Sequence, residues 1–169
     1  MSPIPNRSLA AAAILSLAAS LAAAQVNEPE PWKESAVTPP ADWSAERAVE
    51  FRLNNTATLR YAIDPKTIRF DDDGVVRYVF VARSSSGALN AFFEGIRCQT
   101  AEVKTHARWD PDARQWRTGS DTWQALENRG ATRRAWQMAQ AGVCDGKAPN
   151  RSVNRIVDSL RNGRADQMR

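Results

Sequence analysis

A polar turn between two apolar runs constrains this sequence more than any other feature. The segment VVRYVFVARSSSGALNAFFEGIRCQT spans Val75 to Thr100, and the run Ser84-Ser85-Ser86-Gly87 interrupts it near its middle. Runs of β-branched and aromatic residues on both sides of such a turn predict an antiparallel hairpin. The rest of the chain therefore has to extend or cover a sheet built around these two strands.

The length of this turn decides which residues of the hairpin oppose each other. A three-residue loop from Ser85 to Gly87, with Gly87 left-handed, sets Tyr78 opposite Glu94 and pairs two phenylalanines across the strands. A four-residue loop instead sets Arg77 opposite Glu94. Turn chemistry and the phenylalanine pair favour the first register, and the sequence leaves the second one open.

Further strand-like runs lie on both sides of the hairpin. The runs NTATLRYAID and KTIRF come before it, and Asp71 to Gly74 predicts the turn that leads into Val75. The run EVKTHARW, the turn signal Asp110-Pro111-Asp112 and the run RQWRTG predict a second hairpin. We therefore expect the strands to form an antiparallel β-meander.

The pattern becomes helical after Ser120. Thr132 is the expected cap of a helix that ends at Gly142. A second helix is predicted after Pro149, because apolar residues recur there at helical spacing: Val153, Ile156, Val157 and Leu160. The fold class is therefore α+β, with the antiparallel meander packed against C-terminal helices in a single domain.

The N-terminal segment predicts export. Arg7 precedes an apolar run and three small residues that end at Ala24, which is typical of a signal peptide cleaved before Gln25. The apolar run is shorter than the roughly 20 residues that a membrane anchor needs. No cysteine stands at the cleavage site, so we expect a periplasmic protein that is not a lipoprotein and has no transmembrane segment after cleavage. The chain divides into a signal peptide (1–24), an irregular leader (25–42), an α+β domain (43–162) and a polar tail (163–169).

Cys98 and Cys144 are the only two cysteines, and we expect them to form a disulfide in an oxidising compartment. A metal or redox site lacks the necessary residues, because there is no Cys-x-x-Cys and His106 is the only histidine. We therefore expect no metal and no cofactor.

The net charge gives no indication of a nucleic-acid partner. Removal of residues 1–24, which contain Arg7 and no acid, leaves a net charge of +3, which is too small for that.

The strand that ends at Cys98 contains the main candidate for function, Glu94. Alternation places Phe92, Glu94, Ile96 and Cys98 on one face and Phe93, Gly95 and Arg97 on the other. If the disulfide joins this strand to a helix, Glu94 points inward and needs a partner. We expect Tyr78 first and an arginine next. Gly95 leaves room for Arg77 or a ring on the opposite face.

Three function classes remain open from the residues alone. The first is a non-enzymatic binding or structural domain that uses Glu94, Arg77, Arg97 and Tyr78 as tentative binding residues, with a protein or an envelope polymer as partner. The second is a periplasmic enzyme with a site around Glu94, Arg77 and Arg97. No catalytic motif accompanies these residues, so we assign no catalytic residue and regard an enzyme as the weaker hypothesis.

The third function class is a glycan-binding module that uses Trp109, Trp116 and Trp123 and requires exposed, coplanar rings. The sequence leaves the oligomeric state undefined.

The order of these motifs resembles the cryptic neisserial protein one-like family of exported proteobacterial proteins. The segment DGVVRYVFVARSSSGALNAFFEGIRCQTAEVK, the tryptophans that follow it and the later lone cysteine carry the resemblance, which extends from Trp32 to Leu160. The resemblance implies a cell-envelope protein of unassigned function, and it supplies no catalytic residues to carry over. Many relatives look like lipoproteins, and this chain departs from them because it lacks the lipidation cysteine.

Overall fold

The computed structural model describes residues 30–52 and 59–163. The predicted signal peptide, the first residues of the predicted leader and the tail after residue 163 lie outside the described residues. Among the described residues, no helix is long and apolar enough to cross a membrane.

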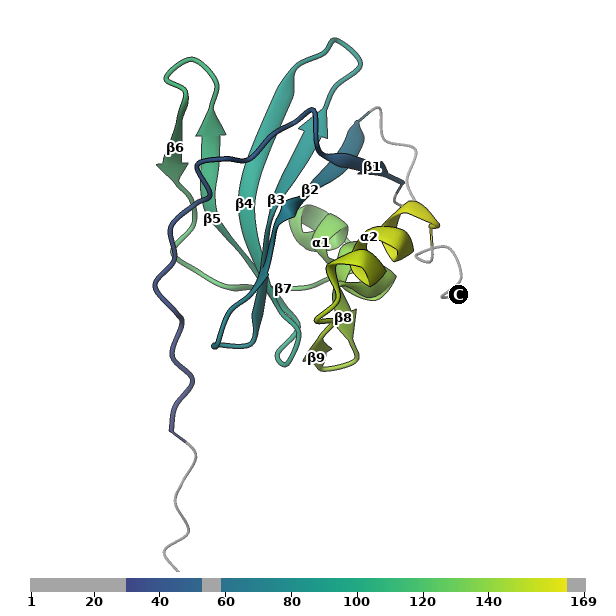
Figure 1. Cartoon of the computed structure of the whole chain (residues 1–169). Coiled ribbons are helices and arrows are strands. Elements are labelled where there is room, and N and C mark those ends of the chain that lie inside the picture. Colours follow the sequence, from purple (N-terminus) through teal and green to yellow (C-terminus); the bar gives the residue numbers. More distant parts are fainter. Residues whose placement is uncertain (1–29, 53–58, 164–169) are drawn as a thin grey trace, which may run out of the picture. The chain divides into compact units, whose positions relative to one another are not determined.

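The strands form the predicted antiparallel meander, in which each strand pairs with the next one along the chain (Figure 1). The strands run in the order β1 (Val49–Phe51), β2 (Arg60–Phe70), β3 (Val75–Arg83), β4 (Leu89–Arg97), β5 (Glu102–Asp110) and β6 (Gln115–Thr118). The short strand β7 (Gln124–Ala125) also pairs with β5. The fold class predicted from the sequence is confirmed.

The hairpin between β3 and β4 has the three-residue loop. Tyr78 lies opposite Glu94 and Phe80 lies opposite Phe92, so the register that places Arg77 opposite Glu94 is excluded. Gly87 has φ of +85°, in the left-handed region that the loop requires. The backbone N–H of Ser84 donates to the carbonyl of Ala88 at 2.9 Å and closes the loop.

Strand β2 contains the end of the first expected run, residues 60–64, and the whole of the second, residues 66–70, while residues 55–58 of the first run lie outside the described residues. Pro65 lies between these runs and cannot donate to the ladder, and the pairing with β3 shifts between Asp64 and Arg69. Thr67 bridges this irregularity, because its hydroxyl donates to the carbonyl of Asp64 and accepts the N–H of Val79. One bulged strand therefore replaces two short ones.

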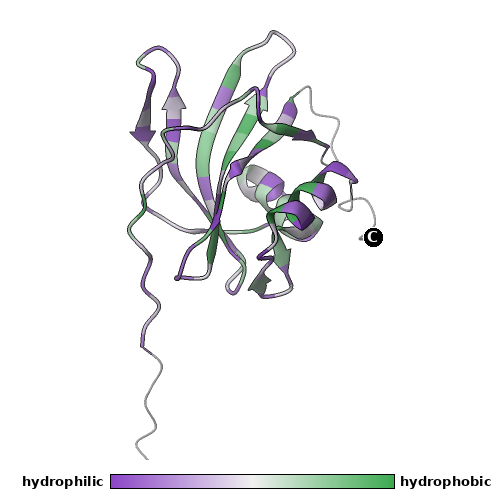
Figure 2. Cartoon of the chain, viewed as in Figure 1, coloured by the Kyte–Doolittle hydropathy of each residue, from purple (hydrophilic) through white to green (hydrophobic). Residues whose placement is uncertain are grey.

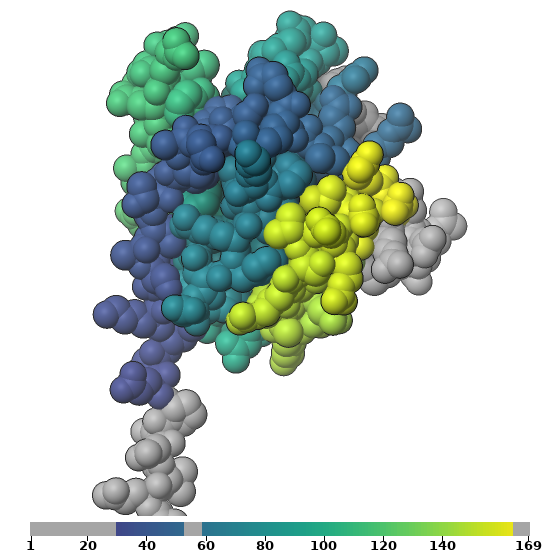
Figure 3. Space-filling model, viewed as in Figure 1, coloured from purple at the N-terminus to yellow at the C-terminus, as the bar shows by residue number. Residues whose placement is uncertain are grey.

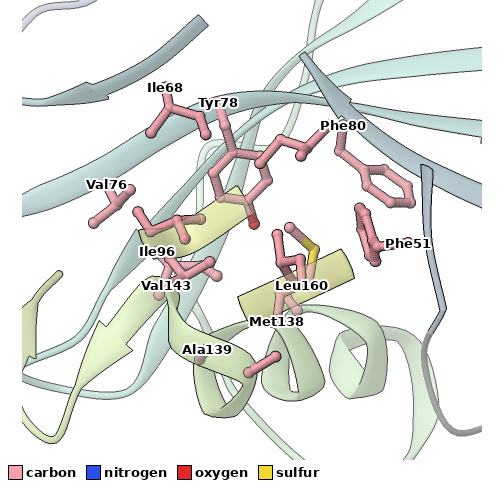
Figure 4. Packing of buried hydrophobic residues seen from close by; sticks show 14 of the residues in the cluster. Phe51, Ile68, Val76, Tyr78, Phe80, Ile96, Met138, Ala139, Val143 and Leu160 are labelled. Atoms are coloured by element: carbon pink, nitrogen blue, oxygen red, sulfur yellow. The ribbon is translucent and has the colours of Figure 1, made fainter. Parts of the chain in front are cut away.

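The helices lie on one face of the sheet, in the order expected. They are α1 (Arg133–Met138), which continues into a π-helical turn (Ala139–Val143), and α2 (Val153–Arg161). Between them β8 (Cys144–Asp145) pairs with β9 (Ala148–Pro149). The apolar residues of Figure 2 concentrate on the central strands and on the inner sides of these helices. Figure 4 shows Tyr78 and Ile96 of the sheet packed toward Met138, Val143 and Leu160.

The starts of α1 and α2 differ in whether a side chain caps them. The hydroxyl of Ser152 accepts the N–H of Arg155 and caps α2, whose apolar stripe is packed against the sheet. Thr132 precedes α1 as expected but does not cap it, since its hydroxyl accepts the N–H of Glu127. Gly142 has φ of +128° inside the π-helical turn, and the helical segment ends one residue later.

Cys98 and Cys144 form the predicted disulfide, which joins the residue after β4 to β8. This bond fixes the helical layer to the sheet. It also confirms that the face of β4 with Cys98 and Glu94 is the one that the helices cover.

The second face of the sheet has an apolar core of its own, which includes Val79, Val81 and Phe93. An irregular segment, residues 32–48, covers this core with Val37, Trp43 and Ala48, and we call it the strap. In Figure 3 the blue strap crosses the sheet on one side and the yellow α2 lies on the other. Because both faces are covered, β3 is almost entirely buried.

Candidate ligand-binding groove

Glu94 is held by an arginine that sequence reasoning did not identify. The side chain of Glu94 is 2% exposed. The guanidinium of Arg134, on α1, donates to both carboxylate oxygens, at 2.6 Å from Nη2 to Oε1 and 2.8 Å from Nη1 to Oε2. The hydroxyl of Thr105 donates to Oε1 at 3.4 Å. The carboxylate is therefore satisfied in place and has no free oxygen directed at solvent.

The surroundings of Arg134 keep it charged. Its guanidinium lies 3.8 Å from the centre of the Phe80 ring, a cation–π contact. Burial disfavours the charged form, but the carboxylate of Glu94 outweighs this effect and raises the pKa of Arg134 above its usual value. Together, the ion pair and the ring contact hold the start of α1 against the sheet.

Tyr78 is not the partner of Glu94, contrary to our first expectation. Its buried hydroxyl lies beside the ion pair and is influenced by both charges, but it makes no well-formed hydrogen bond with either group. Burial and the nearby Glu94 carboxylate raise the pKa of Tyr78 well above 10. Figure 4 shows the Tyr78 ring directed from the sheet toward the helical layer.

The Glu94–Arg134 pair forms part of the wall of a hollow between the sheet and α1, which we call the groove. The groove has a volume of about 560 Å³. Apolar side chains from β2 to β5 form its floor: Tyr61, Phe80, Ala82, Phe92 and Val103. Two segments form its rims. Polar residues after β6 form one, Ser120, Thr122 and Gln124, and residues 130–134, which lead into α1, form the other.

Arg108 is one of three arginines that line the groove, together with Arg133 and Arg134. It lies opposite Phe92 on β5, and its guanidinium is 5.3 Å from the centre of that ring. Arg108 is exposed and makes no ion pair within the described part of the chain. Glu94 is the single acidic residue among the described residues that line the groove, and Arg134 neutralises it. The groove therefore has a positive charge without a matching negative one.

Arg77 lies on the opposite face and is locked in a separate network. Its buried guanidinium donates to Asp71 at 2.7 Å and to both carboxylate oxygens of Asp73, at 2.7 and 3.0 Å. Burial opposes ionisation of Asp73, but these bonds lower its pKa overall. Arg77 thus ties the β2–β3 turn to the sheet and has no donor pointed at an open site.

His106 is the neutral neighbour of this network. Its Nε2 accepts from Nε of Arg77 at 3.3 Å, and its Nδ1 lies 3.6 Å from Oε1 of Glu34. Burial and the charge of Arg77 lower the pKa of His106 to about 4. A side chain on residue 95 would lie 2.8 Å from Nε2, so Gly95 makes room for the imidazole and for Arg77 as expected.

Arg97 also lies apart from Glu94. Its guanidinium stacks over Trp32 of the strap at 3.8 Å from the ring centre, and it pairs with Glu102 at 3.7 Å. The structure therefore does not assemble Glu94, Arg77 and Arg97 into one site. It places Glu94 on the helix side of the sheet and the two arginines on the strap side.

The three tryptophans do not form a flat platform. Trp109 and Trp116 are cross-strand neighbours whose rings meet at 72°, and Trp43 of the strap packs against both. Trp123 packs edge-on against Trp32 at 82°. All three side chains are half-buried. The coplanar exposed pair that glycan stacking requires is absent from Trp109 and Trp116, which pack the strap onto the sheet.

These features define a class of protein, a disulfide-linked α+β domain with a meander sheet, one helical face and a small groove between them. The chain belongs to the CNP1-like family, whose family model matches residues 27–161. This match confirms the resemblance seen in the sequence. Neither the curated proteins nor the solved structures contain a match to the chain.

Proposed function

We propose that this chain is an exported, non-enzymatic binding domain of the bacterial cell envelope, and that the groove is its ligand site. The observation that carries the proposal is a hollow of about 560 Å³ with an aromatic floor and polar rims. Ligand sites in proteins commonly have volumes of roughly 300–1,000 Å³ and this mixture of apolar walls and a few polar groups.

The state of Glu94 favours binding over proton transfer. A general base needs a carboxylate oxygen that can reach the proton it removes. Arg134 engages both oxygens of Glu94, and only one weak further contact, from Thr105, is present. The pair instead gives the groove a rigid wall, which suits a site that holds a ligand in one orientation.

The disulfide and the family resemblance support the proposed location in the periplasm. A bond between Cys98 and Cys144 persists in an oxidising compartment such as the periplasm. The family resemblance implies an exported protein, and the N-terminal sequence fits a signal peptide. Amino-terminal sequencing of the protein recovered from the periplasm tests this part, with Gln25 as the expected first residue.

Photo-crosslinking in the native cells tests the site. A photoreactive residue in place of Thr122, on the rim, is expected to capture a discrete ligand. Ala131→Trp fills the groove from its exposed rim and is expected to abolish this capture. Ala113→Trp, an equally exposed change on the β5–β6 turn, serves as the matched control and leaves capture intact. Capture that survives Ala131→Trp unchanged would show that the groove is not the site.

A further inference from the structure

We infer that the groove selects a small organic anion with an aromatic or aliphatic body, an inference that rests on the proposed function. The chemistry is that of a carboxylate, sulfonate or phosphate attached to an apolar group. The anionic end lies at Arg108, and the apolar body lies on the floor beside Tyr61 and Phe92.

The need for an anion follows from the charges that line the groove. Glu94 and Arg134 neutralise each other through two hydrogen bonds. Arg108 remains, with its guanidinium over Phe92 and with no carboxylate partner among the described residues. A planar guanidinium above an apolar surface offers several N–H donors in a fixed fork, which matches a carboxylate or phosphate group. A cationic ligand would meet repulsion from Arg108 and find no free acid.

The need for an apolar body follows from the floor. The rings of Phe80 and Phe92 stack with their centres 6.2 Å apart, and Tyr61 lies 5.5 Å from Phe80. Phe80 itself is only 1% exposed and lies under the Arg134 guanidinium, so the half-buried rings of Tyr61 and Phe92 present the aromatic surface that a ligand can cover. Covering such a surface removes it from water and contributes roughly 25 cal/mol for each Å² buried. A simple inorganic anion would gain none of this stabilisation.

The surroundings of the groove favour a small diffusible ligand over a lipid surface. Insertion into a membrane requires several protruding apolar side chains. Among the described residues, Leu59 is the single large hydrophobic side chain that is exposed. The rim after β6 consists of serine, threonine and glutamine, which suit a hydrated opening.

Two dyes with the same arylamine skeleton test the inference on the full mature chain. One is 1-anilinonaphthalene-8-sulfonate, which carries an anionic group. The other is N-phenyl-1-naphthylamine, which has the same rings and no charge. Fluorescence titration is expected to give one saturable site for each dye, with the sulfonate bound more tightly.

Four variants assign the charge and the position. Arg108→Gln is expected to weaken the sulfonate about tenfold, which is 1.4 kcal/mol, while the affinity for the neutral dye changes less than about twofold. Arg108→Lys retains most of the sulfonate affinity because it keeps the charge. Arg151→Gln makes the same change in net charge on an exposed residue outside the groove and leaves both affinities unchanged. Ala131→Trp blocks both dyes, and thermal unfolding checks that each variant is folded.

The outcomes separate this inference from the proposed function. Equal binding of both dyes with no effect of Arg108→Gln would overturn the anion selectivity, while a block by Ala131→Trp would still support the groove as a binding site. Binding that Ala131→Trp leaves unchanged would overturn both. Sulfonate binding lost equally in Arg108→Gln and Arg151→Gln would indicate general charge attraction and would also overturn the inference.

Discussion

Glu94 and Arg77 show two ways in which this chain keeps charged groups away from water. Arg134 neutralises Glu94 between the sheet and α1, and two aspartates neutralise Arg77 on the strap side. Removing charges from water costs several kcal/mol for each ion, and well-placed partners with several hydrogen bonds are required to offset this cost. Both networks meet this condition with short, multiple hydrogen bonds.

Removal of one partner from the groove pair is expected to be costly. Arg134→Met leaves the buried Glu94 carboxylate without its cation, and we expect a loss of about 3 kcal/mol in the free energy of unfolding at neutral pH. The double variant Glu94→Gln/Arg134→Met should recover most of this loss, because no charge is then left unpaired. Urea unfolding of the single and double variants measures the coupling.

An exposed pair provides the control for this measurement. Arg129 pairs with Glu127 at 3.2 Å, and its side chain is 86% exposed. Arg129→Met should cost less than about 1 kcal/mol, as is usual for surface ion pairs. Equal losses for Arg129→Met and Arg134→Met would contradict the role assigned to the buried pair.

His106 predicts a pH dependence of stability. Its pKa is about 4 in the folded protein and 6.5 in the reference state, so the unfolded chain takes up the proton first as the pH falls. The stability that neutral His106 provides is complete above pH 6.5 and is lost progressively down to about pH 4. The shift corresponds to about 3 kcal/mol.

Unfolding of the wild type and His106→Gln between pH 4.5 and 7.5 tests this dependence. The wild type should lose more stability toward low pH than the variant, with up to about one extra proton taken up on unfolding. The carboxylate of Asp73 titrates in both proteins, so the difference reports the imidazole together with its effect on the neighbouring Glu34. Parallel pH profiles would show that His106 does not have the assigned pKa.

At the scale of the secondary-structure elements, the disulfide joins the sheet to the helical layer. It joins two cysteines that are 46 positions apart in the sequence, Cys98 and Cys144. On the chain-entropy model a loop of this length stabilises the fold by about 4 kcal/mol. Cys98→Ala/Cys144→Ala should therefore lower the unfolding free energy by about 4 kcal/mol. The wild type in reductant should approach the same value, and a variant as stable as the oxidised protein would refute the estimate.

Much of the arrangement of elements was predictable, because it depends on local signals. The Ser84–Gly87 turn determined the register of β3 and β4, and the apolar stripe of α2 identified its buried face. The strands β1, β7, β8 and β9 were not predicted, since each has only two or three residues and forms only where tertiary contacts hold it. The local sequence pattern also gave a wrong prediction at β2, which is one strand and not two. The side chain of Thr67 bridges the interruption at Pro65.

The candidate site was predicted only in part. Alternation along β4 correctly placed Glu94 under the helices and Arg97 on the opposite face. The partner Arg134 lies 40 residues away on a helix, and neither spacing nor composition distinguishes it from the neighbouring Arg133. The role of Arg108 depends on its position across from Phe92, which follows from the register of β5. Such long-range pairings are set by the assembled sheet and not by any one segment.

At the scale of the whole domain, the strap completes the fold. Trp32 donates from Nε1 to the carbonyl of Asp73 at 2.8 Å, and Glu34 pairs with Lys104 at 2.9 Å. A chain that begins at Asp42 lacks both anchors and Val37, which exposes part of the second core. We expect it to lose at least about 3 kcal/mol of stability relative to a chain that begins at Glu30. Chemical unfolding of the two chains decides the point, and stabilities within about 1 kcal/mol would contradict it.

The unbroken order of strands from β1 to β6 also orders the events of folding. Each of these strands pairs with the next strand along the chain. The strap and α2, in contrast, come from the two ends of the domain's sequence and pack against the sheet. Contacts close in sequence form sooner, because closing a short loop costs less entropy. The central hairpin should therefore gain protection in pulsed hydrogen exchange before α2 does. Until the two ends arrive, β3 has two uncovered apolar faces, and this interval is when the chain is most prone to aggregate.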